Sequence, residues 1–276
     1  MLLIRRLDMK NTIYIFIMSI ITVSIFYMIN DTYKLSKKYE YTYNEYSKTK
    51  TLNNNIEREV NNLIGSFIGM IIGKKEINNK IDKINYEEFL YKIKDKIKTN
   101  TLYIIILLII SMGAYFLFNK LIVISFLYIQ SIIFLIYGLI SPIFLMYVIQ
   151  DIATSFIILQ FESNSIITSI EKLFNQNNYF VGGIILLFSV IFPLLKTIIS
   201  FVSLYIKNIN ILNQITNISS KLAKLSMTDI FVLSIFLVYL SPKNDGIIKT
   251  ELEIGFFFFF IYVVISLFIA IINKEK

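Results

Sequence analysis

The heptapeptide Val190-Ile191-Phe192-Pro193-Leu194-Leu195-Lys196 lies inside an almost entirely apolar segment from Tyr179 to Lys207. This segment is longer than the roughly 20 apolar residues that cross a bilayer as a helix. Small and polar residues recur in it at helical spacing and so share one face: Gly182, Ser189, Pro193, Lys196, Ser200, Ser203 and Lys207. The pattern predicts a transmembrane helix that turns this face toward neighbouring helices and its apolar face toward lipid.

Two interpretations of this polar face stay open. Small residues let transmembrane helices approach closely, and proline is tolerated within a span, so the face could serve packing alone. Lys196 lies about ten residues from the end of the segment, and its ammonium could extend to the headgroups. A lysine within a span otherwise faces protein or a water-filled cavity and indicates a functional site.

Long apolar blocks recur throughout the 276 residues, of which 56% are hydrophobic, and the mean hydropathy is +0.67. This composition predicts an all-α polytopic membrane protein with about six transmembrane helices. The expected spans cover residues 11–29, 101–118, 121–148, 179–207, 226–240 and 254–272. The third span contains Gly138, Ser141 and Pro142, which predict a helix break or a site of close packing.

The residue types that are absent exclude several classes of function. The chain contains neither histidine nor cysteine, which removes Cys/His zinc sites and the usual Ser-His-Asp and Cys-His nucleophiles. We therefore expect no enzyme activity, no catalytic residues, no metal and no cofactor. The formal net charge of +8 lies mostly outside the spans, so a nucleic-acid partner is not expected either.

The chain divides into three regions. Residues 1–29 combine a basic head with an apolar run and predict a retained signal anchor. Residues 30–100 are rich in Lys, Glu, Asn and Tyr and predict an extracytoplasmic helical insertion, with surface helices over 33–50 and 85–98. The apolar segment 63–72 is too short to span, so it either packs between these helices or lies in the membrane interface. Residues 101–276 predict a five-helix membrane region.

Two segments outside the spans have a predicted character of their own. Residues 150–178 are expected as a connector with an amphipathic piece over 165–174, and residues 241–253 as a turn-rich loop.

Charge asymmetry predicts the topology of the spans. Six spans place both termini on one side, and the loops on that side carry most of the basic residues: Arg5, Arg6, Lys10, Lys120, Lys207, Lys221, Lys224, Lys274 and Lys276. The positive-inside rule therefore predicts that both termini are cytoplasmic.

Ser226 and Asp229 stand at the start of the predicted fifth span. Their spacing is that of a capping box, and a helix cap is one sufficient explanation for them. The topology also places Asp229 in the same leaflet as Lys196, where an ion pair would neutralise both charges and provide a site that changes its protonation. The candidate transport network is therefore Pro193, Lys196, Thr197, Ser200, Ser203, Ser226 and Asp229.

Four segments in the second half of the chain resemble the paraquat-inducible protein A family of bacterial inner-membrane proteins. Gly138-Leu139-Ile140-Ser141-Pro142 resembles the family's proline near the end of a span, and Ser165-Ile166-Ile167-Thr168-Ser169-Ile170 its outer-loop segment. Phe192-Pro193-Leu194-Leu195-Lys196 resembles its most specific signature. Leu225-Ser226-Met227-Thr228-Asp229-Ile230-Phe231-Val232 resembles its Trp-Ser-Met-x-Asp-Val-Phe pattern, with leucine in place of tryptophan. The resemblance covers roughly residues 121–273, in a single copy and without the Cys-x-x-Cys ribbon of many members.

The resemblance implies a function and a location. It implies a multi-pass subunit of the bacterial inner membrane that exchanges phospholipid with a periplasm-spanning partner of the mammalian-cell-entry type and supports envelope integrity. The order of span, outer region and span over the first 118 residues favours an alternative, a membrane sensor or scaffold with an extracytoplasmic input region. A membrane enzyme is disfavoured because no clear pair of carboxylates shares a span.

Overall fold

The computed structural model describes residues 2–64, 75–152, 155–206, 214, 217 and 248–274. Helices dominate it, together with one small three-stranded sheet. Within the described residues, five helical segments are long and apolar enough to cross a membrane: Lys10–Glu45, Glu88–Leu117, Lys120–Ile140, Tyr179–Ser203 and Ile254–Ile272. The prediction of an all-α polytopic membrane protein is confirmed, and the predicted span 226–240 lies outside the described residues.

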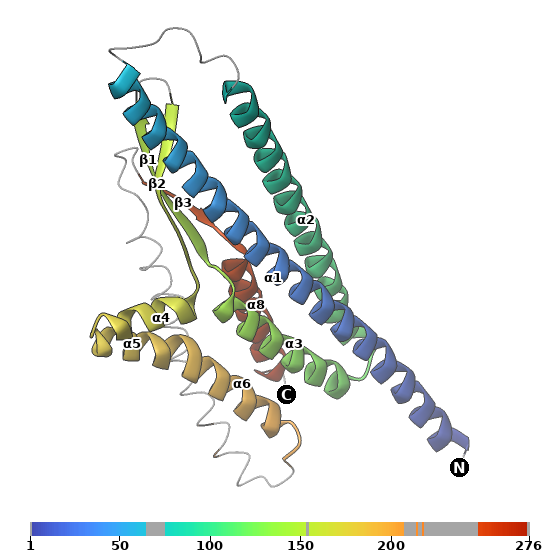
Figure 1. Ribbon diagram of the computed structural model, residues 1–276. Helices are drawn as coiled ribbons and strands as arrows, with labels where there is room; N and C mark the ends of the chain where they lie inside the picture. Colours follow the sequence, from blue (N-terminus) through green and yellow to red (C-terminus); the bar gives the residue numbers. More distant parts are fainter. Residues whose placement is uncertain are drawn as a thin grey trace.

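The first two helices, α1 (Leu2–Ile64) and α2 (Lys75–Leu117), form a long antiparallel pair (Figure 1). In each of them an apolar part and a polar part form one unbroken helix, whereas the sequence predicts separate span and surface helices there. The helices continue because α1 contains no glycine or proline and α2 contains only Gly113. Residues 30–64 and 75–100 of this pair are called the stem below. The apolar segment 63–72 lies largely outside the described residues.

The helices α3 (Lys120–Ile140) and α8 (Ile254–Lys274) pack against each other at the centre of the bundle. Glycine allows their backbones to touch, because a methyl group at Gly138 would lie 2.8 Å from the backbone nitrogen of Phe259. The buried rings of Phe134 and Phe258 meet one turn away, with centroids 6.1 Å apart. This contact fixes the start of α8 beside the end of α3.

The predicted third span ends early, and a sheet follows it. Ser141 leaves helical geometry with φ −78° and ψ 150°, and Pro142 cannot donate a helix hydrogen bond, so α3 stops rather than kinks. The chain then forms β1 (Phe144–Ile152), β2 (Ser155–Asn164) and later β3 (Ile248–Leu252), paired antiparallel in the order β2-β1-β3. Three predictions were therefore wrong where the strands lie. Residues 144–148 were predicted as the end of a span, residues 150–164 as part of a connector, and residues 248–252 as part of a loop. An apolar run has no period that separates a strand from a helix.

The fourth span has an irregular turn before its proline. A short amphipathic helix, α4 (Ile166–Asn175), comes first, followed by α5 (Tyr179–Ile185), the π-helical turn η1 (Leu186–Ile191) and α6 (Phe192–Ser203). Within η1 the amide of Phe192 donates to the carbonyl of Leu187, five residues earlier. Pro193 lacks an amide hydrogen and its ring crowds the preceding turn, so the helix widens there. The regular helix ends at Ser203, before the predicted end at Lys207.

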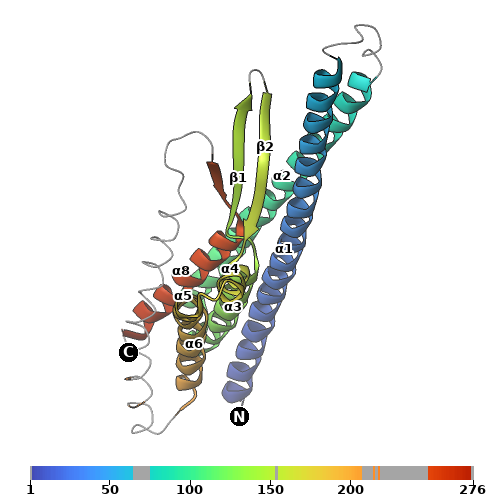
Figure 2. The same ribbon diagram turned by 60° about the vertical axis from the view of Figure 1, so that its left-hand side comes forward.

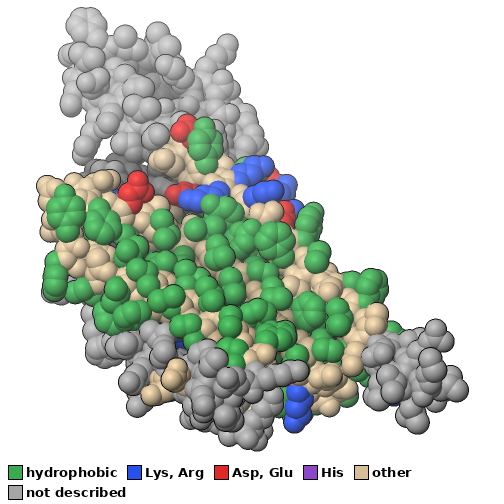
Figure 3. All heavy atoms as spheres, turned by 90° about the horizontal axis from the view of Figure 1, so that it is seen from below, with side chains coloured by type: hydrophobic (Ala, Val, Ile, Leu, Met, Phe, Trp, Pro, Cys, Tyr) green, Lys and Arg blue, Asp and Glu red, His purple; other side chains and the backbone are tan. Residues whose placement is uncertain are grey.

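The molecule has two distinct ends (Figures 1 and 2). The stem and the sheet project together from one end of the span bundle, and the start of α1 and the end of α8 lie toward the other end. Between them, hydrophobic side chains cover most of the surface seen in Figure 3, and charged side chains gather toward one end of it. Phe16, Ile109 and Phe260 of the span helices are more than half exposed, as expected for side chains in contact with lipid.

Candidate functional site

Pro193 and Thr197 form a polar contact between α6 and α8 inside the apolar part of the bundle. The Thr197 hydroxyl donates to the Pro193 carbonyl at 2.8 Å and lies 3.2 Å from the hydroxyl of Tyr262 on α8. The Tyr262 hydroxyl also donates to the Pro193 carbonyl, at 3.3 Å. All three residues are buried. Hydrogen bonds of this kind tie transmembrane helices together where no water can satisfy the polar atoms.

The remaining candidates on α6 lie at its border with other elements. Lys196 and Ser200 are half-buried, and the Ser203 hydroxyl donates to the Ser200 carbonyl at 2.7 Å. Ser226 and Asp229 lie outside the described residues. The Lys196–Asp229 ion pair therefore stays a prediction, and the described part of the network is a helix-to-helix contact with a half-buried lysine beside it.

The break at Ser141 and Pro142 organises the junction between the spans and the sheet. The carbonyl of Pro142 accepts from the amide of Gly255 at 2.8 Å, and the carbonyl of Ile143 accepts from the amide of Glu253 at 2.8 Å. Gly255 is required at this point, because a methyl group there would lie 2.5 Å from the Ser141 carbonyl oxygen. Together with the tight contact at Gly138, this junction holds Glu253 at the start of α8.

A second polar network, which the sequence does not predict, joins α1, α2 and α3. The side chain of Gln130 is completely buried; its amide nitrogen donates to the Thr22 hydroxyl at 2.9 Å. Its amide oxygen accepts from the Ser111 hydroxyl at 3.0 Å. Each of these residues is one of a few polar residues within an apolar run, and that was the only available signal. The network fixes how the three helices sit against one another.

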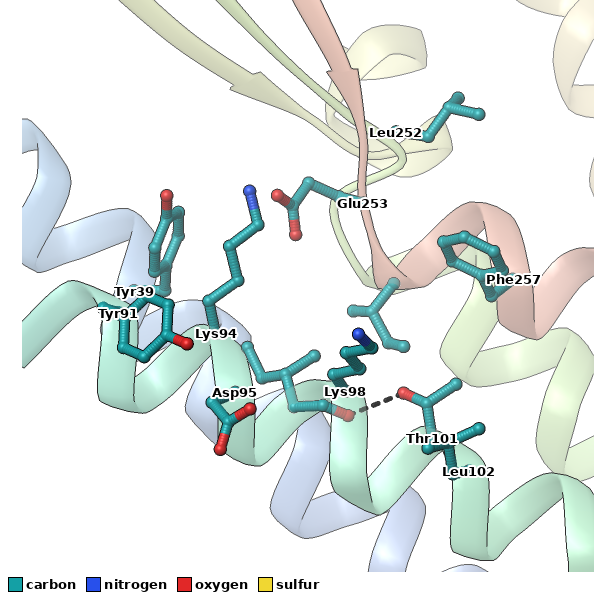
Figure 4. A pocket seen from close by; sticks show the side chains of 12 residues that line it. Tyr39, Tyr91, Lys94, Asp95, Lys98, Thr101, Leu102, Leu252, Glu253 and Phe257 are labelled. Carbon is teal, nitrogen blue, oxygen red and sulfur yellow. Dashed lines mark hydrogen bonds between the residues drawn. The ribbon is translucent and has the colours of Figure 1, made fainter.

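A cleft lies where the stem meets the junction of β3 and α8 (Figure 4). Its volume is about 470 Å³, within the range of small-ligand sites. One wall comes from α1 and α2 and the other from the end of β3 and the start of α8. Its lining comprises Tyr39, Tyr91, Lys94, Asp95, Ile97, Lys98, Thr101, Leu102, Leu252, Glu253, Ile254 and Phe257. Charged and apolar side chains therefore face the same space.

The charges of this cleft are unequally partnered. Lys94 forms an ion pair of 2.7 Å with Glu251, and both side chains are partly exposed. In Figure 4 the Lys94 ammonium also points toward the Glu253 carboxyl. Within the described part of the chain, the side chain of Lys98 makes no hydrogen bond and no ion pair. The cleft thus combines two lysines, of which Lys94 is paired, with the carboxyl groups of Asp95 and the buried Glu253.

Glu253 is the most electrostatically perturbed group at the cleft. It is only 9% exposed, and burial raises the pKa of its carboxyl from the ordinary 4.5 to about 7. The negative charges of Glu251 and Glu40 raise this pKa further, whereas Lys94 and the backbone amide of Ile254 lower it. Glu253 therefore holds a proton over part of the neutral pH range and can exchange it when a charge arrives nearby.

The junction and the fourth span both lie in the part of the chain that matches a known family. Residues 124–275 match the family described as paraquat-inducible protein A. The chain belongs to this family. No curated protein and no solved structure matches it significantly. The family match includes the Pro193 contact and the start of α8, whereas α1 and α2 precede it, so the cleft joins a paraquat-inducible protein A unit to helices outside the matched region.

Proposed function

We propose that this member of the paraquat-inducible protein A family is a membrane subunit of a phospholipid transport system. It exchanges phospholipid between the bacterial inner membrane and a periplasm-spanning partner of the mammalian-cell-entry type, and it supports the integrity of the envelope. Family membership supports a function within a membrane, and the lining of the cleft supports a lipid as its ligand.

The amphipathic lining of the cleft is the observation that carries this proposal. Lys94 and Lys98 lie at its polar part, and Leu102 and Phe257 lie at the beginning of the apolar parts of α2 and α8. Leu102 is 55% exposed and Phe257 is 43% exposed, so apolar surface is available beside the charges. A phospholipid has the same order of anionic headgroup and apolar chains, and lysines bind phosphate as point charges.

The orientation that this function needs is both termini in the cytoplasm, with the stem and sheet outside. Because the natural chain has no cysteine, single cysteines report the topology directly. An impermeant thiol reagent applied to intact spheroplasts should label Glu171→Cys on α4 and spare Lys120→Cys at the start of α3. The opposite labelling pattern would place the stem in the cytoplasm and contradict the proposal.

The functional test combines deletion with lipid analysis. Cells without the protein should become more sensitive to detergents, and the purified protein should carry phospholipid that mass spectrometry identifies. A protein free of lipid from cells whose envelope is unaltered would contradict the proposal. The alternative, a sensor or scaffold, is favoured by the unbroken path of α1 and α2 from the membrane into the stem. Under that alternative, exchanging the stem would change a cellular response and leave lipid content unchanged.

A further inference from the structure

The cleft contains charges of both signs in separate positions. These positions restrict the class of ligand further than the amphipathic lining of the cleft does. The ammonium of Lys98, which has no partner among the described residues, comes from α2, and the buried carboxyl of Glu253 comes from the opposite wall. A purely anionic headgroup would satisfy the lysine but disfavour the ionised form of Glu253, which it would meet as a like charge. A ligand with one anionic and one cationic group satisfies both.

We propose that the cleft is a binding site for the phosphoethanolamine headgroup of a phospholipid. The phosphate lies against Lys98, and the primary ammonium donates hydrogen bonds to the carboxylate of Glu253. The acyl chains leave along Leu102 and Phe257 toward the apolar part of the bundle. This inference rests on the proposed function, and it assigns the headgroup class and the two residues that select it.

The chemistry of the ammonium distinguishes this headgroup from its relatives. A primary ammonium has three N–H donors, whereas the quaternary ammonium of phosphocholine has none. Phosphoglycerol is anionic and brings no cation to Glu253. Because Glu253 is buried, a charge-assisted hydrogen bond to it is shielded from water and stronger than one at the surface.

The environment of Glu253 supports the same assignment. Its carboxyl faces Lys94 from α2 and is close enough to Glu251 on β3 and Glu40 on α1 to be affected by their charges. Lys94 is already paired with Glu251 at 2.7 Å. A cation from a ligand would stabilise the ionised form of Glu253, so headgroup binding and loss of the Glu253 proton are coupled.

The test measures lipid binding to the full-length protein by native mass spectrometry, in detergent with equal amounts of phosphatidylethanolamine, phosphatidylglycerol and phosphatidylcholine. The wild-type protein should bind phosphatidylethanolamine about tenfold more tightly than phosphatidylcholine, the difference that one charge-assisted hydrogen bond makes. Glu253→Gln should remove most of this preference and retain binding of the other two lipids. Lys98→Gln should weaken binding of all three.

Lys92→Gln is the matched control, because Lys92 lies on α2 outside the cleft lining and pairs with Glu88 at 2.7 Å on the exposed surface. Its lipid profile should be that of the wild-type protein. Soluble glycerophosphoethanolamine should compete weakly, because it lacks the acyl chains; competition equal to that of the lipid would overturn the assignment to a lipid headgroup.

Equal binding of the three lipids by the wild-type protein, or an unchanged preference in Glu253→Gln, would also overturn the inference. Either result leaves the proposed function standing if phospholipid still co-purifies and deletion still weakens the envelope. An absence of all bound phospholipid would contradict both proposals.

Discussion

Replacing Glu253 with glutamine should abolish a specific pH dependence of stability. In the folded protein the pKa of this carboxyl is about 7, whereas its ordinary value is 4.5. Below pH 4.5 the carboxyl is protonated in both states, and above about pH 7 it is ionised in both. Between these values only the unfolded chain releases the proton, so the contribution of Glu253 to the free energy of unfolding falls as the pH rises.

The size of this effect follows from the two pKa values. At about 1.4 kcal/mol for each pKa unit, the decrease amounts to about 3 kcal/mol across the interval. Glutamine keeps the size and an acceptor oxygen but does not titrate. The variant should therefore match the wild-type protein at pH 4.5 and be more stable by up to about 3 kcal/mol at pH 8.

The assay is equilibrium unfolding of both proteins in the same detergent at intervals from pH 4.5 to 8. Glu88→Gln is the control, because Glu88 is an exposed carboxylate of the stem paired with Lys92, and its profile should follow that of the wild-type protein. A constant difference between wild-type and Glu253→Gln at every pH would refute the reasoning, since it would show that Glu253 titrates alike in both states.

Three further experiments test the packing and the polar contacts. Gly138→Ala should lower the free energy of unfolding by about 1–3 kcal/mol, because its methyl group meets the backbone of α8. Gly113→Ala is the control: in the described structure its methyl group would have no atom of another helix or strand within 4 Å, so the change should be neutral or stabilising. Gln130→Leu should lower stability by about 1 kcal/mol through loss of two interhelical hydrogen bonds. If Lys196 and Asp229 form an ion pair, their single neutral substitutions should reduce membrane abundance and the double substitution should restore it; additive losses would show that the two residues do not meet.

Periodic and compositional signals predicted the five spans that lie in the described residues, because a transmembrane helix needs a long apolar run and little else. The predictions failed where two structures share one composition. Residues 144–148 are as apolar as the helix before them, and only the geometry at Ser141 and Pro142 turns them into a strand. The charged residues of the stem suggested separate surface helices, whereas no residue in α1 interrupts the helix.

The site was less predictable than the fold because its parts are distant in the sequence. Lys94 and its partner Glu251 are 157 residues apart, and Gln130 and Thr22 are 108 residues apart. One amino-acid sequence contains no information about which distant residues meet in space. Glu253 resembles any carboxylate of a loop in the sequence, and only the structure shows that it is buried. Helical spacing singled out Pro193, and Thr197 entered the candidate network only as a neighbour of Lys196; their contact with Tyr262 required the packing of α8.

Transfer of phospholipid out of a bilayer tests the central claim most directly. The protein would be reconstituted in vesicles that contain fluorescent phosphatidylethanolamine, and the lipid acquired by a soluble acceptor, the proposed mammalian-cell-entry-type partner, would be followed over time. The account predicts faster transfer than from vesicles without the protein, with a reduced rate for Lys98→Gln and a wild-type rate for Lys92→Gln. Equal transfer rates with and without the protein would contradict it.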